Sequence, residues 1–335
     1  MENNSFSDSE IVGIIDSRDE TYIENLYLRA RKAAKQIYGN KIYLRALIEI
    51  SNYCVRDCFY CGIGRSMAIE RYRLTEEEIL SSCDRAYKLG FRTFVLQGGE
   101  DPFFTDVILA GVIGRIKALF PDIRVTLSLG VRTYESYRKL KAAGADRYLL
   151  RHEVNDERAF SMLHDKGQSL AARIRALTDL RKAGFVIGTG FMVQAPYTGS
   201  ATILKDIKLI RQLKPEMIGI GPFIPASGTR FENCDAGTSD VTTKLLAILR
   251  IENPRSLIPS TTALNSLDEN GMMRGILAGA NVVMPNLSPD RARKNYTLYN
   301  NKRSTGLESG DGVEDLNNLF KEYGYEIEVS GGDNK

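Results

Sequence analysis

The sequence lacks several features that would narrow its class at once. It has no tryptophan, which decides nothing, and only five cysteines in 335 residues. Three of the five are clustered, which fits a reducing cytoplasm better than a disulfide framework. No segment approaches the roughly 20 apolar residues of a membrane-spanning helix. The formal charge of +3, without a long basic tract, argues against a nucleic-acid or membrane-surface partner.

The beginning of the chain and its overall composition point the same way. Met1 to Ser17 holds acidic residues and no uninterrupted apolar run, so we expect neither a secretory signal nor a basic transit peptide. Hydrophobic residues make up 43% and charged residues 26% of the chain, close to the norm for globular proteins. We therefore expect a cytoplasmic globular protein.

Three cysteines, Cys54, Cys58 and Cys61, stand within eight residues. Three thiolates at this spacing can hold three irons of a 4Fe-4S cluster and leave the fourth iron open to a small molecule. Clusters that only transfer electrons are normally closed by four cysteines. A structural zinc site is the alternative, but it needs four ligands. The other cysteines and both histidines are the residues left to complete one: Cys83, Cys234, His152 and His164.

With Tyr60 before the third cysteine, the segment matches the pattern C-x3-C-x-aromatic-C in full. It resembles the signature of the radical S-adenosylmethionine (SAM) superfamily. The resemblance implies a 4Fe-4S cluster whose open iron binds the amino and carboxylate groups of SAM. One electron, supplied by a reductant such as ferredoxin or flavodoxin, then cleaves SAM to methionine and a 5′-deoxyadenosyl radical. The protein supplies binding, orientation and exclusion of water.

Strands and helices are expected to alternate along the chain. Several helical stretches end in a small residue and glycine, the usual left-handed C-cap, followed by a short apolar run. Eight βα units of this kind favour an α/β fold of the (β/α)8 TIM barrel type, with a doubly wound open sheet as the alternative. The expected strands are Ala46–Ile50, Thr93–Leu96, Arg124–Leu127, Tyr148–Leu150, Phe185–Ile187, Met217–Ile220, Leu257–Ser260 and Val282–Met284.

Three regions are expected. Residues 1–40 form an N-terminal helical extension, in which Glu20–Tyr38 is an amphipathic helix closed by Gly39. Residues 41–300 form the barrel. Residues 301–335 form a C-terminal extension, with a flexible loop at Ser304–Gly312, a last helix at Val313–Tyr323 and a loose tail at Ser330–Lys335.

Polar and small residues follow the expected strands, at the end of the barrel where chemistry collects. Gly98 and Gly99 can be a tight turn, but in the superfamily a Gly-Gly-Glu segment at this point binds the amino group of SAM, and Gly98, Gly99 and Glu100 match it. Arg151 and Glu153 can be an ion pair at the rim. By resemblance Glu153 binds the ribose hydroxyls and Arg173 the methionine carboxylate. The implied cofactor-binding set also includes Tyr60 and Ser128.

The resemblance extends over roughly residues 22–299 to one branch, the maturation enzymes of FeFe-hydrogenase known as HydE. Segments such as Val95–Pro102, Arg147–Glu153 and Ile258–Ala263 carry it. It implies an organometallic substrate, an iron-bound cysteine with carbon monoxide and cyanide, delivered by another maturase. The substrate-lining residues implied in this way are Thr126, Arg151, Met217, Thr261, Thr262, Tyr296 and Tyr299.

Two departures from that branch stand out. Some members bind a second iron–sulfur cluster near the carboxyl end, but Asn300–Lys335 contains no cysteine, so we expect no second cluster here. Val131 stands where typical members have glutamate, which leaves the substrate open.

Rival functions remain at this point. Methylornithine synthase, an amino-acid mutase, shares Glu100-Asp101-Pro102 and the element Gly167-Gln168-Ser169. Biotin synthase needs further inward-facing cysteines that Cys83 and Cys234 are poorly placed to provide. A non-catalytic carrier or scaffold for a metal complex is the alternative of another class.

Overall fold

The computed structural model describes residues 5–303 and 305–330. Ser304 in the expected flexible loop and residues 331–335 of the expected tail lie outside the described residues. Within the described ranges, no helix is both long and apolar enough to cross a lipid bilayer.

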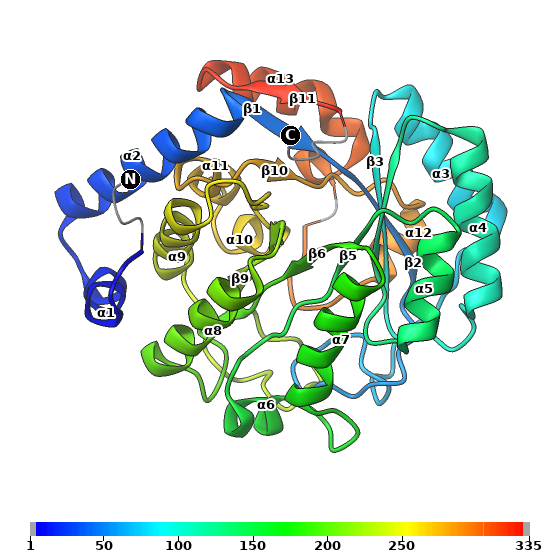
Figure 1. Cartoon of the computed structure of the whole chain (residues 1–335), viewed down its shortest axis with the longest axis horizontal. Helices are drawn as coiled ribbons and strands as arrows, with labels where there is room; N and C mark the ends of the chain where they lie inside the picture. The colour runs from blue at the N-terminus through cyan, green and yellow to red at the C-terminus, as the bar shows by residue number, and fades with distance from the viewer. Residues whose placement is uncertain (1–4, 304, 331–335) are drawn as a thin grey trace.

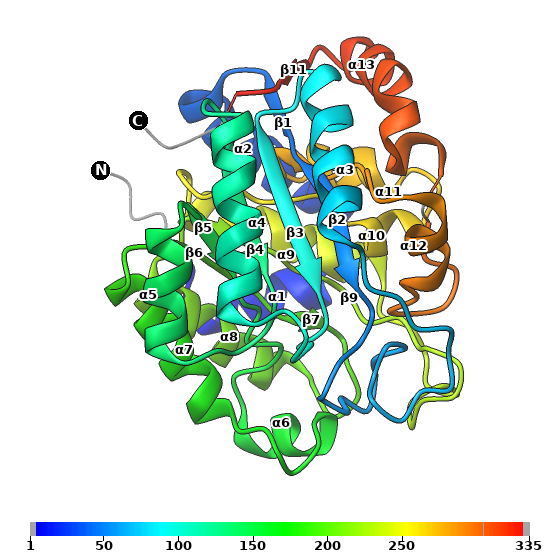
Figure 2. The ribbon, with the colours of Figure 1, turned by 90° about the vertical axis from the view of Figure 1, so that its right-hand side faces the viewer.

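A continuous ladder of parallel strands forms the centre of the molecule. Its order is β2-β3-β4-β5-β6-β8. The bounds are β2 (Ala46–Ser51), β3 (Thr93–Gly98), β4 (Arg124–Ser128), β5 (Arg147–Leu149), β6 (Val186–Thr189) and β8 (Met217–Ile218). In Figure 2 the arrow of β3 points downward, so the carboxyl ends of these strands lie in the lower half of that view.

The ladder closes on itself. Met217 of β8 bridges Leu257, Pro259 bridges Val282 of β10 (Val282–Val283), and β10 pairs with β1 (Lys41–Leu44), which leads directly into β2. All of these pairings are parallel. The molecule is therefore a (β/α)8 barrel and not an open sheet. The expected strand at Leu257–Ser260 is reduced to single bridges.

Two short ladders lie beyond the eight expected strands. At the amino end, β11 (Glu326–Glu328) pairs in parallel with β1, so the end of the chain extends the barrel wall. At the carboxyl end, β7 (Met192–Val193) pairs with β9 (Gly221–Pro222) and prolongs β6 and β8. Neither β11 nor the β1 half of the first strand was predicted from the sequence.

Helices surround the barrel, and α2 packs against α9 (Figure 1). Thr75 and Glu78 form a capping box at the start of α3. The helices are α1 (Asp8–Asp16), α2 (Glu20–Tyr38), α3 (Glu76–Lys88), α4 (Asp106–Leu119), α5 (Tyr134–Ala142), α6 (Glu157–Leu163), α7 (Leu170–Lys182), α8 (Ser200–Leu213), α9 (Ser239–Glu252), α10 (Thr262–Leu267), α11 (Gly271–Leu277), α12 (Asp290–Asn295) and α13 (Val313–Glu322).

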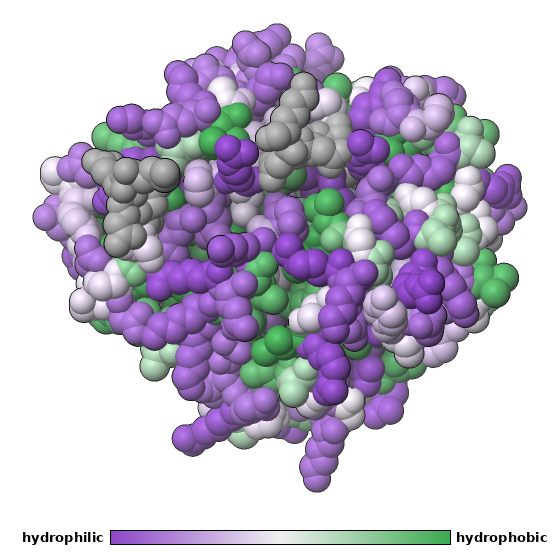
Figure 3. All heavy atoms as spheres, viewed as in Figure 1, coloured by the Kyte–Doolittle hydropathy of each residue, from purple (hydrophilic) through white to green (hydrophobic). Residues whose placement is uncertain are grey.

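Successive side chains of a strand alternate between the core under the helices and the interior of the barrel. Ile48 and Ile50 of β2 join the large apolar cluster shared with the helices, whereas Glu49 between them is turned to the other face and is fully buried. The face of the molecule seen in Figure 3 is mostly hydrophilic, with smaller hydrophobic areas between polar side chains.

The segment around residue 308 is more ordered than expected. Where a flexible loop was predicted, residues 306–308 and 310–312 form two short 3-10 helices. Glu308 is buried there and accepts hydrogen bonds from Thr262 Oγ1 at 2.8 Å and Asn265 Nδ2 at 2.9 Å. This part of the C-terminal segment is therefore anchored to α10.

Candidate active site

A cavity of about 290 Å³ opens at the carboxyl ends of the strands. It gathers all ten residues predicted for the cluster and for SAM, together with three of the predicted substrate residues. The former are Cys54, Cys58, Cys61, Tyr60, Gly98, Gly99, Glu100, Ser128, Glu153 and Arg173, and the latter are Arg151, Tyr296 and Tyr299.

The loop between β2 and α3, residues 52–75, carries the three cysteines and is shaped by one arginine. Arg71 donates hydrogen bonds to four carbonyl oxygens of this loop, those of Asn52, Ile63, Gly64 and Met67, at 2.5 to 3.0 Å. The five N–H groups of a guanidinium suit this task. In Figure 2 the loop lies at the lower right, at the end toward which β3 points. We call residues 52–75 the cysteine loop.

Gly99 lies too close to the cysteine loop for any larger residue. A Cβ atom there would overlap the carbonyl oxygen of Tyr53 and stand 2.8 Å from the Cβ atom of Cys54. The absence of a side chain also lets the backbone N–H of Glu100 reach 3.4 Å from the Sγ atom of Cys54. The Gly-Gly segment is therefore fitted to the cysteine loop as well as exposed to the cavity.

We expect Gly99→Ala to displace Cys54 and to reduce the iron bound after anaerobic reconstitution to a small fraction of the wild-type content. Overpacking of this kind also costs about 1–3 kcal/mol of folding free energy. Gly114→Ala in α4 is the matched control, because no heavy atom lies within 4 Å of a Cβ atom there. Iron analysis and thermal unfolding measure both effects, and full iron binding by the Gly99 variant would refute the close-approach argument.

Glu100 joins the cysteine loop to the loop after β4. Its carboxylate accepts hydrogen bonds from Arg56 Nε at 2.6 Å and from the backbone N–H of Val131 at 3.1 Å. Gly130 has a φ of +74°, and a side chain there would collide with Glu100. Because Val131 contributes only its backbone N–H, the departure from glutamate at this position leaves the contact intact.

The three thiols suit a cluster. Burial raises the pKa of Cys54 and Cys61, and it raises the pKa of Cys58 to about 11, so the free thiols are neutral at physiological pH. Iron binding would replace their protons. In the described part of the chain, no three His, Cys, Asp or Glu side chains are placed to share one metal ion. A cluster does not require this, because each cysteine binds a different iron.

Arg151, Glu153 and Arg173 form the polar wall opposite the cysteines. Arg151 Nη2 lies 3.1 Å from Glu153 Oε2, in an ion pair without the alignment of a hydrogen bond. Arg173 Nη1 donates to the carbonyl oxygen of Arg151 at 3.4 Å. Glu153 has a φ of +69°, a strained left-handed conformation for a residue with a side chain. Such strain is typical of functional positions.

His152 lies on the other side of this strand end, away from the cavity. It is fully buried, with Nδ1 2.9 Å from Thr189 Oγ1 and Nε2 3.2 Å from Asp206 Oδ1. The side chain therefore joins the end of β5 to β6 and α8 and supports the backbone that carries Arg151 and Glu153.

His164 is the partner of the motif tyrosine. Its Nδ1 lies 2.9 Å from the carbonyl oxygen of Phe160, which can only accept, and its Nε2 lies 3.2 Å from the Tyr60 hydroxyl. Burial lowers the pKa of His164 to about 4, so the ring is neutral at physiological pH. Nδ1 therefore carries the proton, and the Tyr60 hydroxyl donates to Nε2. Apart from the zinc alternative, the sequence indicates no role for His164.

Four of the predicted substrate residues do not line the cavity. Thr126 and Met217 are buried deeper in the barrel. Thr262 is held by Glu308, and Thr261 lies beside it. The Oγ1 atoms of Thr126 and Thr261 are buried without a hydrogen-bond partner among the described residues. Both hydroxyls therefore keep an unused hydrogen-bonding capacity within the described chain.

A buried ion pair holds the segment that contributes Tyr296 and Tyr299. Lys302 Nζ lies 2.5 Å from Glu49 Oε1 and also donates to the carbonyl oxygen of Tyr296 at 2.9 Å. Asn286 Nδ2 donates to the other Glu49 oxygen at 2.7 Å. Burial raises the pKa of Glu49, and the Lys302 ammonium opposes part of that rise. This pair was not predicted from the sequence.

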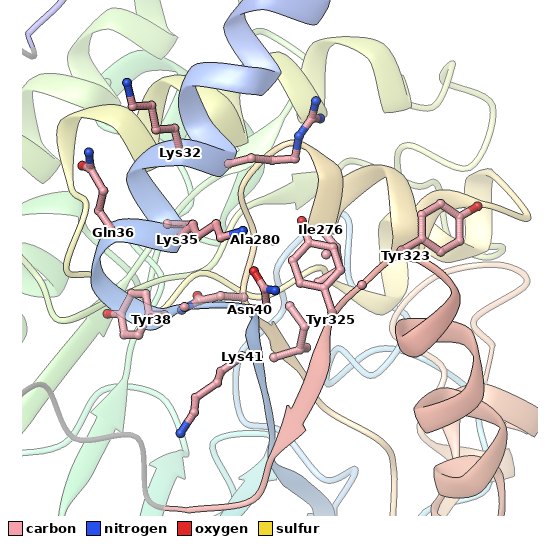
Figure 4. Close-up of a pocket in the computed structure, with 16 residues that line it drawn as sticks. Lys32, Lys35, Gln36, Tyr38, Asn40, Lys41, Ile276, Ala280, Tyr323 and Tyr325 are labelled. Carbon is pink, nitrogen blue, oxygen red and sulfur yellow. The ribbon is translucent and has the colours of Figure 1, made fainter.

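A second cavity lies at the other end of the barrel, beside the amino ends of β1 and β10 (Figure 4). It is lined by basic and aromatic side chains, among them Lys32, Lys35, Lys41 and Tyr325. Lys41 is already paired with Glu328 at 2.6 Å. None of the predicted site residues lines this cavity.

This chain is similar to known proteins in both sequence and architecture. The profile of the radical SAM superfamily matches residues 48–210. The chain is 36% identical over 306 residues to the FeFe-hydrogenase maturase subunit HydE of Thermotoga maritima, over 90% of this chain and 86% of that protein. It is 28% identical over 301 residues to 3-methylornithine synthase of Methanosarcina acetivorans, over 89% of this chain and 85% of that protein. The crystal structure of methylornithine synthase (PylB) matches with a TM-score of 0.86 at 24% identity, covering 97% of this chain and 94% of that one.

The chain therefore belongs to the radical SAM superfamily and is an enzyme of that class. Membership implies a 4Fe-4S cluster, SAM, a small-molecule substrate and a reductant. Of the two relatives named, HydE is the more similar in sequence.

Proposed function

We propose that this enzyme cleaves SAM reductively and acts on an iron-bound cysteine complex during assembly of the di-iron site of FeFe-hydrogenase. The observation that carries the proposal is the 36% identity to HydE over 90% of the chain. It is supported by the cavity, in which all ten predicted cluster and SAM residues meet.

Each part of the cavity has a task in this proposal. Cys54, Cys58 and Cys61 hold the cluster, which when bound supplies the electron and an open iron for SAM. Arg173 binds the methionine carboxylate with a charge-assisted hydrogen bond, and Glu153 accepts from the ribose hydroxyls. Tyr60 and Leu298 exclude water beside the cysteines. Gly98, Gly99, Glu100 and Ser128 complete the cofactor wall.

The substrate occupies the rest of the barrel interior. Arg151 presents its guanidinium, whose Nε and Nη2 atoms have no hydrogen bond in the described structure, to an anionic substrate. Tyr296 and Tyr299 cover it from the C-terminal segment, and Thr126, Met217, Thr261 and Thr262 surround its deeper end. Residues 1–40, 41–300 and 301–335 serve as helical extension, catalytic barrel and C-terminal extension, and the barrel holds the only cluster.

The cellular setting follows from the same proposal. A ferredoxin or flavodoxin supplies the electron, another hydrogenase maturase delivers the substrate, and the reaction takes place in the cytoplasm without nucleic acid or membrane.

One experiment separates the candidate functions. Reconstituted enzyme is mixed with SAM, dithionite and either a synthetic iron-cysteine complex carrying carbon monoxide and cyanide, or lysine. Release of 5′-deoxyadenosine with consumption of the iron complex supports the proposal. A non-catalytic carrier releases no 5′-deoxyadenosine with either compound.

Methylornithine synthase is the second candidate. The 28% identity to 3-methylornithine synthase of Methanosarcina acetivorans and the shared Gly167-Gln168-Ser169 element favour it. Conversion of lysine to methylornithine in the same experiment would establish this function in place of the first.

A further inference from the structure

The loop between α6 and α7, residues 164–169, is fastened to the cysteine loop. Arg56 Nη1 donates to the carbonyl oxygen of Gly167 at 3.1 Å, and the backbone N–H of Asp57 lies 3.4 Å from Asp165 Oδ1. Just before the loop, the backbone N–H of Phe59 donates to the carbonyl oxygen of Leu163 at 2.9 Å. The two loops therefore form one unit, although about a hundred residues separate them.

Within this unit the side chain of Gln168 reaches a cysteine sulfur. Its Nε2 atom lies 3.2 Å from Cys58 Sγ and 2.6 Å from Asp165 Oδ1. A carboxylate only accepts hydrogen bonds, so Asp165 fixes the amide with its nitrogen toward both atoms. One N–H then goes to Asp165, and the second points at the sulfur.

A hydrogen bond at this sulfur changes the energy of electron uptake. A reduced cluster carries one more negative charge, part of which resides on the cysteine sulfurs. Hydrogen bonds to those sulfurs stabilise the reduced form and raise the reduction potential. The backbone N–H of Glu100, which lies 3.4 Å from Cys54 Sγ, acts in the same direction but cannot be removed by a substitution that leaves the backbone unchanged. Gln168 offers a side-chain donor that can.

We propose that Gln168 is a positioning residue that raises the reduction potential of the cluster by donating an N–H group to Cys58 Sγ, with Asp165 fixing its amide. The inference rests on the cluster-binding part of the proposed function. It gives a physical reason for glutamine in the Gly-Gln-Ser element, to which the sequence analysis assigned no task. It requires no partner beyond the one-electron reductant of the reaction.

The test is a redox titration of reconstituted enzyme without SAM, followed by electron paramagnetic resonance. Gln168→Met keeps the length of the side chain and removes the donor. We expect its reduction equilibrium constant to fall about tenfold, which for one electron is about 59 mV toward more negative potential. Gln168→Asn keeps the amide but is one methylene shorter, so we expect a shift in the same direction. Gln36→Met, on the exposed side of α2 beside the other cavity (Figure 4), should leave the potential unchanged.

The possible results distinguish failure of this inference from failure of the proposed function. Wild-type potentials in cluster-loaded Gln168→Met and Gln168→Asn would overturn the inference and leave the proposed function standing. Failure of the wild-type enzyme to assemble a four-iron cluster would overturn both. If only one of the two variants binds a cluster, the reduction potential of that variant is compared with the wild-type value, and an unchanged potential overturns the inference.

Discussion

Cys61→Ser is expected to abolish the reaction completely. Serine is a poor ligand for iron, and the cavity offers no other cysteine, because Cys83 is buried in α3 and Cys234 does not line the site. We expect the reconstituted variant to show no stable four-iron spectrum and to release 5′-deoxyadenosine only at the background rate. Iron and sulfide analysis, together with chromatography of the product, measure both effects.

Cys234→Ser is the matched control, since it removes a half-buried thiol outside the cavity by the same chemical change. It should keep the iron content and the rate of the wild type. If the Cys61 variant turned over SAM at a wild-type rate, the assignment of this loop to the cluster would be wrong.

Lys302→Met is expected to have the largest effect on stability. It leaves the carboxylate of Glu49 fully buried without its cation, and breaking a buried pair in this way costs about 3–5 kcal/mol. Domains are commonly stable by only about 5–15 kcal/mol, so the loss is large. Urea denaturation of the apo protein at neutral pH measures it. Because Lys302 also binds the carbonyl oxygen of Tyr296, we expect weaker substrate binding in the variant that remains folded.

Acid should relieve this destabilisation. Burial already raises the pKa of Glu49, and removal of the ammonium raises it further. In the unfolded chain the carboxyl ionises near its ordinary pKa of 4.5, whereas in the folded variant it holds its proton to higher pH. The variant therefore loses stability relative to the wild type as pH rises from 4.5 through the folded-state pKa. The difference between the two proteins should be larger at about pH 8 than at about pH 5.

Two further variants give this prediction its controls. Combining Lys302→Met with Glu49→Met removes both charges and should recover much of the loss. Lys208→Met breaks an exposed pair with Asp8 and should cost less than about 1 kcal/mol. An equal, small loss in Lys302→Met and Lys208→Met would show that the buried pair is not what anchors the C-terminal segment.

Local patterns in the sequence predicted the barrel and the centre of its site. Several of the expected strands follow a helical run with a terminal glycine, a pattern of residues that are neighbours in the chain, and the three cysteines lie in one loop. The ladder confirms the barrel, including its closure through Leu257 and Val282. The resemblance to a known superfamily added the cofactors, because spacing alone did not exclude zinc.

Contacts between distant residues were not predictable in this way. Gln168 and Cys58 are 110 residues apart, and Glu49 and Lys302 are 253 apart. A glutamate in an apolar strand indicates that a buried cation pairs with it, but the sequence does not indicate which lysine forms the pair. The strand at Lys41–Leu44 was missed for the same reason, since its partners come from the far end of the chain.

The pairing of β11 with β1 has a consequence for how the protein is made. During synthesis β1 leaves the ribosome early, whereas its neighbours β10 and β11 are translated more than 200 residues later. The nascent chain can build the wall from β2 to β8 in order, yet it cannot join the first strand to the last until Glu328 has emerged. Contacts of such long sequence separation form slowly. Pairing of β1 with β10 and β11 is therefore expected to follow the folding of the wall from β2 to β8.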